Sequence, residues 1–122
     1  MPKTIMVVED DEASRHVMSR SLRHASFDVI EAADSMAGLR EFSGHPQIDL
    51  MICDVKMPDG VPHGFALARM ARMQYRELPI IFVTGYRDLI EREGAAEAIG
   101  GPIFYKPLDI SAILAEVQAR LG

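Results

Sequence analysis

The sequence of 122 residues is 48% hydrophobic and 25% charged, so we expect one globular domain, residues 1–122, and exclude an intrinsically disordered chain. The formal charge of −5 is spread along the chain, which argues against direct nucleic-acid binding, and the one cysteine, Cys53, excludes an intrachain disulfide. The sequence contains no signal-peptide pattern and no apolar stretch of membrane-spanning length, so we expect a cytoplasmic protein without membrane contact.

Short apolar runs alternate with helical patterns along the chain. Each run is bounded by polar or turn residues, which predicts buried strands at 5–8, 27–30, 50–54, 80–83 and 103–105. Apolar residues at helical spacing predict helices at 13–25, from 34 or 35 to 44, at about 63–73 and 87–98, and at 110–121. Gly94 makes the fourth helix the least regular, because an interior glycine costs about 1 kcal/mol relative to alanine.

Two of these helices carry specific expectations about which side chains face the core. In the first helix the apolar positions are Val17, Met18, Leu22 and Ala25. In the third helix we expect Phe65, Leu67 and Met70 to point inward. The second helix is expected to be capped by Asp34 or Ser35 and to end at Gly44 and Pro46.

Strands that alternate with helices favour a parallel sheet covered by helices on both faces. The first, third and fourth strands are the most apolar, so they should be central. With right-handed crossovers this gives the strand order 2-1-3-4-5 of a doubly wound, flavodoxin-like (βα)5 fold.

Polar residues that could share a site lie at the ends of the first, third, fourth and fifth predicted strands. Glu9 and Asp10 follow the first strand, Asp54 ends the third, Thr84 follows the fourth and Lys106 the fifth. In a parallel sheet these ends share one edge, and three neighbouring acids repel one another unless a cation is present. All-oxygen ligands favour Mg²⁺. Beside such an ion and Lys106, Asp54 could attack phosphorus and form an aspartyl-phosphate, with Thr84 donating a hydrogen bond.

Four segments carry a family resemblance: Val7–Asp11, Cys53–Pro58, Val83–Gly85 and Tyr105–Pro107. They resemble the receiver (CheY-like) domain of bacterial two-component response regulators. The four motifs occur in order, at receiver spacing, over the whole chain. Each motif alone is weak, but the combination is highly specific.

The resemblance implies a role for each polar residue at the sheet edge. Asp54 would accept a phosphoryl group from the phosphohistidine of a histidine kinase or histidine phosphotransfer protein. Lys106 would pair with the acceptor or its phosphoryl group, and Thr84 would be the switch hydroxyl. Such a domain catalyses only its own phosphoryl transfer and autodephosphorylation. The implied Mg²⁺ ligands are Glu9, Asp10, Asp54 and the backbone carbonyl of Lys56.

The resemblance also implies how the signal leaves the domain. Phosphorylation would change the surface near the fourth helix and fifth strand, which a downstream protein partner reads. The resemblance implies that Gly85 leaves clearance beside the phosphoryl group. It also implies a cis peptide bond between Lys106 and Pro107.

Some positions depart from the family pattern. Ile103 occupies the usual aromatic switch position, with Phe104 on the opposite face of the strand and Tyr105 on the same face. The loop 57–64 is longer than usual, and Lys56 and Tyr86 flank the expected phosphoryl position. We therefore expect the segment that begins near Tyr86 to carry the switch.

Three alternatives remain from the sequence. The chain could be the receiver piece of a hybrid histidine kinase, or a pseudo-receiver that binds partners independently of phosphorylation. A phosphohydrolase with an aspartyl nucleophile is disfavoured, because haloacid-dehalogenase-like enzymes carry Asp-x-Asp after the first strand. Here Asp54 follows the third strand, and Lys56 occupies the second acidic position.

Overall fold

The computed structural model describes residues 2–44, 47–56, 64–85 and 101–122. Its centre is a sheet of five parallel strands in the order β2-β1-β3-β4-β5, which confirms the predicted topology. The strands are β1 (Thr4–Val8), β2 (Asp28–Ala32), β3 (Leu50–Asp54), β4 (Ile80–Thr84) and β5 (Ile103–Tyr105).

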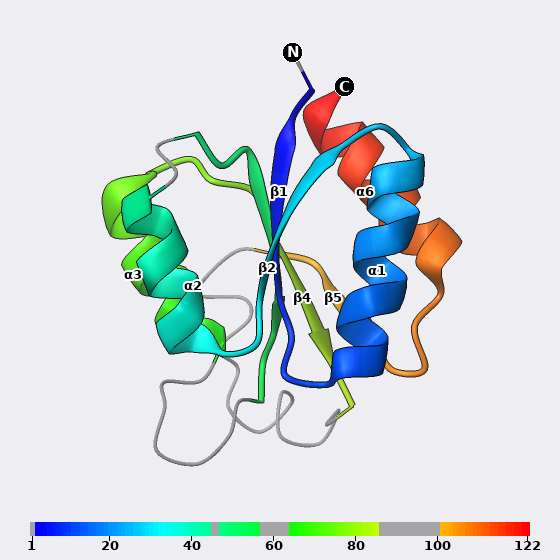
Figure 1. Cartoon of the computed structure of the whole chain (residues 1–122), viewed down its shortest axis with the longest axis horizontal. Helices are drawn as coiled ribbons and strands as arrows, with labels where there is room; N and C mark the ends of the chain where they lie inside the picture. The colour runs from blue at the N-terminus through cyan, green and yellow to red at the C-terminus, as the bar shows by residue number, and fades with distance from the viewer. Residues whose placement is uncertain (1, 45–46, 57–63, 86–100) are drawn as a thin grey trace.

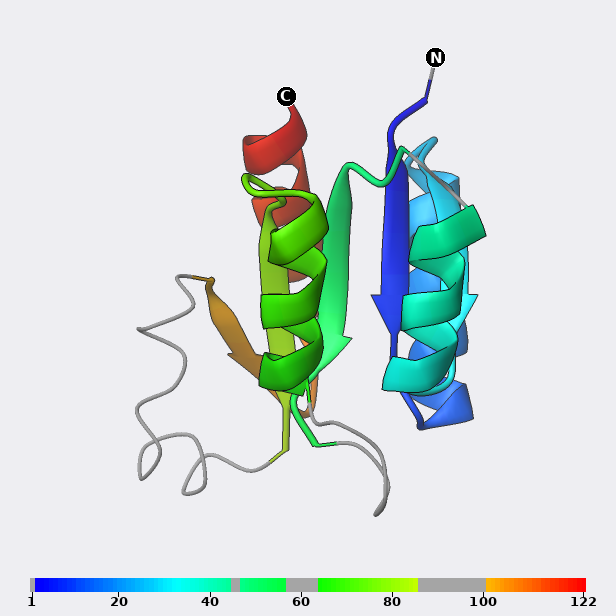
Figure 2. The ribbon, with the colours of Figure 1, turned by 90° about the vertical axis from the view of Figure 1, so that its left-hand side faces the viewer.

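The described helices cover both faces of this sheet. On one face lie α1 (Glu12–His24) and α6 (Ile110–Leu121), and on the other α2 (Ser35–Gly44) and α3 (Gly64–Gln74) (Figures 1 and 2). No helix in these parts of the chain has the length and apolar character to cross a membrane. The helix predicted at 87–98 lies outside the described residues.

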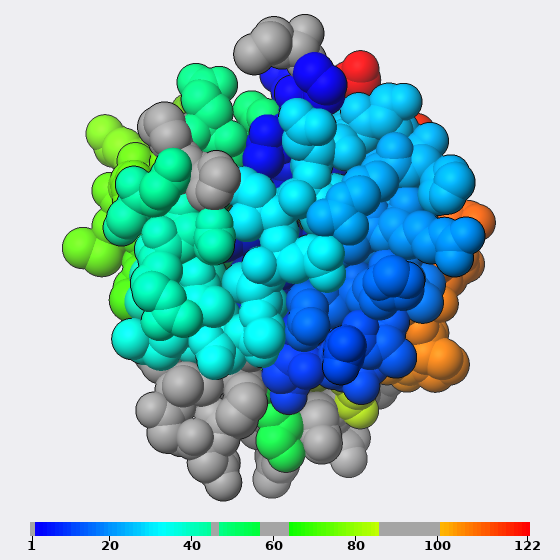
Figure 3. Space-filling view, viewed as in Figure 1, coloured from blue at the N-terminus to red at the C-terminus, as the bar shows by residue number. Residues whose placement is uncertain are grey.

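Burial follows the position of each strand in the sheet. Every residue of β3 and β4 is buried, because both faces and both edges of these strands are covered. The edge strand β2 instead exposes Asp28 and Glu31. Figure 3 views the molecule from this edge and shows side chains of β2 between α1 and α2. Charged residues on an exposed edge discourage pairing with a strand of another molecule.

Three aspartates turn the chain from strand to helix. The side chains of Asp11, Asp34 and Asp109 accept hydrogen bonds from backbone N–H groups three residues later, at 2.9, 2.8 and 3.1 Å. Such N-caps satisfy otherwise unpaired donors and contribute about 1 kcal/mol each. Of the two predicted caps for α2, the structure selects Asp34.

The inward faces of α1 and α3 differ from the prediction. Val17 is 49% exposed, whereas the α1 residues buried against the sheet are Met18, Ser19 and Leu22. Met70 is only half-buried. The small residues Ala68 and Ala71 are buried instead, which lets α3 lie close to the sheet.

The strand predicted at 27–30 is displaced: β2 runs from Asp28 to Ala32. Its register pairs Thr4 with Asp28 and Val8 with Ala32, so β2 extends as far as β1 does. Phe27 precedes the strand and packs against the core on the α1 and α6 side.

Candidate functional site

The register of the central strands brings the predicted acids together. Val8 pairs with Cys53, so Glu9, the next residue, lies beside Asp54 at the end of β3. The Glu9 N–H donates to the Ala32 carbonyl of β2 at 3.0 Å, which extends the sheet by one residue. Asp54 in turn pairs with Val83 of β4. Strand pairing therefore places the backbones of Glu9 and Asp54 side by side.

Glu9, Asp10 and Asp54 form an acidic cluster. Each offers one carboxylate oxygen, and these three atoms lie within 4.8 Å of one another. The Glu9 side chain is fully buried and Asp54 is 4% exposed, whereas Asp10 is exposed. The cluster is therefore closed toward the sheet and open to solvent at Asp10.

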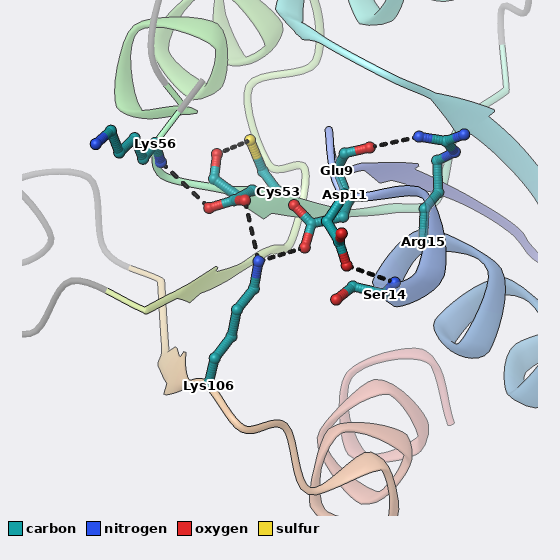
Figure 4. A network of polar contacts seen from close by, with 8 residues as sticks. Glu9, Asp11, Ser14, Arg15, Cys53, Lys56 and Lys106 are labelled. Carbon is teal, nitrogen blue, oxygen red and sulfur yellow. Dashed lines mark hydrogen bonds and ion pairs between the residues drawn. The ribbon is translucent and has the colours of Figure 1, made fainter. Parts of the chain in front are cut away.

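Lys106 contacts both buried members of this cluster. Its Nζ lies 2.5 Å from Glu9 Oε1 and 3.3 Å from Asp54 Oδ2 (Figure 4). The Lys106 N–H donates to the Thr84 carbonyl at 2.8 Å, so pairing between β4 and β5 directs this side chain into the site. Burial lowers the pKa of Lys106, but the Glu9 and Asp54 carboxylates outweigh it, and the net pKa is raised. Lys106 therefore stays protonated.

The Glu9 carboxylate is the most perturbed acid of the site. Burial raises its pKa to about 8, and Asp54 adds to the rise while Lys106 opposes it. Glu9 Oε2 is buried and receives no hydrogen bond from the described residues. An unsatisfied buried oxygen is costly, and a divalent cation would satisfy it. Three carboxylates of this kind fit the oxygen-only preference of Mg²⁺.

The other predicted metal ligand, the Lys56 carbonyl, stays a prediction. The structure instead gives a contact of the Lys56 backbone N–H, which donates to Asp54 Oδ1 at 3.2 Å. The Lys56 side chain extends away from the ammonium of Lys106 (Figure 4). The residues that follow, 57–63, and Tyr86 lie outside the described residues.

Two glycines border the site in different ways. A Cβ on Gly64 would lie 2.2 Å from the Asp54 carbonyl oxygen, so α3 begins directly against the backbone of Asp54. Sequence reasoning placed Gly64 in the loop and missed this contact. Among the described residues, a Cβ on Gly85 would meet only the Lys106 side chain, at 4.0 Å.

The residues of β5 lie as the strand alternation predicts. Ile103 and Tyr105 pack on the core beneath α2 and α3, whereas Phe104 packs on the core beneath α1 and α6. The peptide between Lys106 and Pro107 is cis, as expected. Thr84, the last residue of β4, is buried at the same edge as Asp54.

A largely apolar hollow of about 310 Å³ adjoins the site between α1 and the segment after β5. Val17 is exposed because its side chain borders this hollow. The remaining lining residues are Ala13, Ser14, Lys106, Pro107, Leu108 and Ile110.

Comparison with known proteins gives a consistent match. The family model described as "Response regulator receiver domain" matches residues 5–118. The response regulator MprA of Mycobacterium sp. (strain KMS) is 31% identical over 121 residues, covering 99% of this chain and 51% of the relative. This chain thus spans about half the length of that curated relative.

Two solved structures extend this likeness. The chemotaxis protein CheY4 of Vibrio cholerae superposes with a TM-score of 0.86 at 27% identity, covering 99% of this chain and 100% of the other. The receiver domain of the hybrid histidine kinase CckA has a TM-score of 0.78 at 32% identity, covering 98% and 99%.

Proposed function

The chain belongs to the family of response regulator receiver domains, and we propose that Asp54 is its phosphoacceptor, taking a phosphoryl group from a phosphohistidine. The observation that carries this proposal is the position of the Asp54 carboxylate. It ends a central strand, is almost buried, contacts the protonated Lys106 and shares a cluster with two further acids, Glu9 and Asp10. That setting combines a nucleophile with the charges that phosphoryl transfer requires.

In the proposed reaction an Asp54 carboxylate oxygen forms a bond to phosphorus while the P–N bond to the donor imidazole breaks. The imidazole nitrogen keeps the electron pair and is protonated as it leaves. Glu9, Asp10, Asp54 and the Lys56 carbonyl would hold Mg²⁺, and the bound ion would supply positive charge to offset that of the transferred group. The reaction product is an acyl phosphate on Asp54.

Two side chains stabilise this product. Lys106 already contacts Asp54 Oδ2, so a small movement of its ammonium reaches a phosphoryl oxygen. Thr84 supplies a hydroxyl donor from the end of β4. The domain catalyses only this transfer to itself and the later hydrolysis of its own acyl phosphate.

The proposed partners are proteins. The apolar hollow beside Lys106 favours contact with a protein donor, either a histidine kinase or a histidine phosphotransfer protein. The signal would leave through the surface near residues 87–98 and β5. The supporting observation is the hydrogen bond from the Lys106 N–H to the Thr84 carbonyl, which links the end of β5 to the end of β4. A downstream protein would read that surface. We place residues 1–122, as one domain, in the cytoplasm with no direct nucleic-acid contact.

A second candidate is a receiver that forms part of a hybrid histidine kinase. Its support is the likeness to the receiver domain of the hybrid kinase CckA, at 32% identity. In both cases Asp54 has the same role, and the two candidates differ only in which protein supplies the phosphohistidine.

The test is incubation with acetyl phosphate and Mg²⁺, followed by intact-mass measurement. We expect the wild type to gain one phosphoryl group. Asp54→Asn, and the wild type in EDTA, should not gain it at a comparable rate. Asp28→Asn, the same change at an exposed position of β2, should be labelled like the wild type. A purified phosphohistidine protein should show the same pattern. Labelling of Asp54→Asn by either donor would overturn the assignment of Asp54 as the phosphoacceptor, whereas a wild type that neither donor labels would favour the pseudo-receiver.

A further inference from the structure

The backbone carbonyl of Glu9 has its hydrogen-bond partner outside the sheet. Its N–H is bonded to Ala32, but Val8 is the last paired residue of β1. The Glu9 carbonyl accepts a hydrogen bond from Arg15 Nη1 of α1 at 2.9 Å (Figure 4). Arg15 thus ties the first turns of α1 to the end of β1.

The same arginine also reaches the neighbouring strand. Arg15 Nε lies 3.5 Å from Glu31 Oε1 of β2, and the Arg15 side chain is 19% exposed. Glu31 Oε2 in turn lies 3.2 Å from Nη2 of Arg23, which is in the last turn of α1. Arg15 and Arg23 therefore share the Glu31 carboxylate, but of these two arginines only Arg15 also donates to the Glu9 carbonyl.

We propose that Arg15 is a positioning residue for the divalent-cation site, fixing the peptide between Glu9 and Asp10 through the Glu9 carbonyl. This inference rests on the proposed Mg²⁺ site. The carbonyl belongs to the peptide unit that joins the two acids, so one hydrogen bond orients the backbone of both ligands. Groups that orient ligands without touching the metal typically change its affinity 10- to 100-fold when removed.

The side-chain chemistry explains why such an anchor matters here. A glutamate has one more rotatable bond than an aspartate, so the Glu9 carboxylate depends more on a fixed backbone to reach the cluster. Asp10 is exposed, and its position is set mainly by the peptide that precedes it. Without Arg15 both carboxylates would sample more orientations, and the cation would have to order them.

Electrostatics alone predicts the opposite result. A positive guanidinium near the site repels a divalent cation, so its removal should strengthen binding if anchoring contributes nothing. Glu31 offsets part of that charge through its pairing with Arg15. The sign of the change in Mg²⁺ affinity therefore separates positioning from charge.

The experiment compares Arg15→Met with Arg23→Met, which removes the same donors and charge from the same Glu31 carboxylate without touching Glu9. Mg²⁺ is titrated calorimetrically into each protein, and the free energy of unfolding is measured in urea. We expect Arg15→Met to raise the Mg²⁺ Kd about tenfold. Arg23→Met should change it by less than about twofold. Arg15→Lys, which restores a donor and the charge, should recover part of the affinity.

Three outcomes overturn the proposal: an Arg15→Met affinity equal to or above that of the wild type, equal weakening in both methionine variants, or no recovery in Arg15→Lys. If Arg15→Met does not fold, Arg15→Lys against Arg23→Lys decides by the same comparison. Failure of the wild type to bind Mg²⁺ would instead refute the cation site itself. A wild type that binds, with an Asp10→Asn variant that does not, leaves the proposed function standing whatever Arg15 does.

Discussion

The ammonium of Lys106 lies between Glu9 and Asp54, so the protein carries its own counter-cation inside the acidic cluster. A divalent ion bound to the same carboxylates has to share them with this positive charge. Lys106→Met should therefore strengthen Mg²⁺ binding, by about tenfold for a change near 1.4 kcal/mol, while slowing phosphorylation of Asp54. Calorimetric titration and intact-mass labelling measure the two effects separately.

The control for that variant is Lys56→Met, which removes a charge whose side chain extends away from the cluster (Figure 4). Screening by solvent should keep its effect on Mg²⁺ affinity below about threefold. Equal gains in the two variants would mean that net charge, and not the contact of Lys106 with Glu9, controls the affinity. Weaker binding in Lys106→Met would contradict the competition outright.

Individual site residues differ in how far the sequence predicts them. The positions of Asp54, Thr84 and Lys106 follow from apolar runs that end in a polar residue, because parallel strands finish at one edge. The complete burial of Glu9 and the contact of Arg15 do not follow. They depend on how α1 is rotated about its axis and on a partner in β2, and neither has a signal in local spacing.

At the scale of elements, α3 begins directly against the backbone at the end of β3. The Gly64 N–H donates to the Val55 carbonyl at 2.7 Å, and a Cβ at Gly64 would lie 2.8 Å from Val55 Cα. Gly64→Ala must therefore displace either α3 or the backbone of the phosphoacceptor. We expect a loss of about 1–3 kcal/mol in the free energy of unfolding, measured in urea, with weaker Mg²⁺ binding.

Gly44→Ala provides the comparison, because none of the described residues has an atom within 4 Å of a Cβ built at Gly44, the last residue of α2. Alanine favours the helix there, so the variant should be neutral or more stable by up to about 1 kcal/mol. A Gly64→Ala protein as stable as Gly44→Ala would show that the junction between β3 and α3 relaxes without cost.

Strand bounds were predictable where an apolar run stops at a turn or polar residue, and the inward face of a helix was less so. The bounds of β3 and β5 agree with the prediction, since each apolar run stops at a turn or polar residue. The buried face of α1 was not predicted correctly, because Val17 has the helical spacing of a core residue but borders the hollow beside Pro107. Spacing identifies an apolar stripe, whereas packing of neighbouring elements decides which edge of it is covered.

At the scale of the whole molecule, the raised pKa of Glu9 couples folding to pH and to the cation. In the unfolded chain this carboxyl loses its proton near its ordinary value of 4.5, whereas in the folded protein it keeps the proton up to about pH 8. Between these values the folded state binds more protons. The stability that Glu9 contributes is thus complete below about pH 4.5 and is lost as pH rises toward 8.

We therefore expect the free energy of unfolding in EDTA to fall, on the order of a few kcal/mol, as pH rises through this window. Glu9→Gln cannot lose a proton and should flatten that part of the profile, which isolates Glu9 from the other titrating groups. Saturating Mg²⁺ should restore stability most strongly near pH 8, where the cation no longer has to displace the Glu9 proton. Urea unfolding across the window, with and without Mg²⁺, measures all three effects. Parallel profiles for the wild type and Glu9→Gln would show that the buried carboxyl does not control the pH dependence of folding.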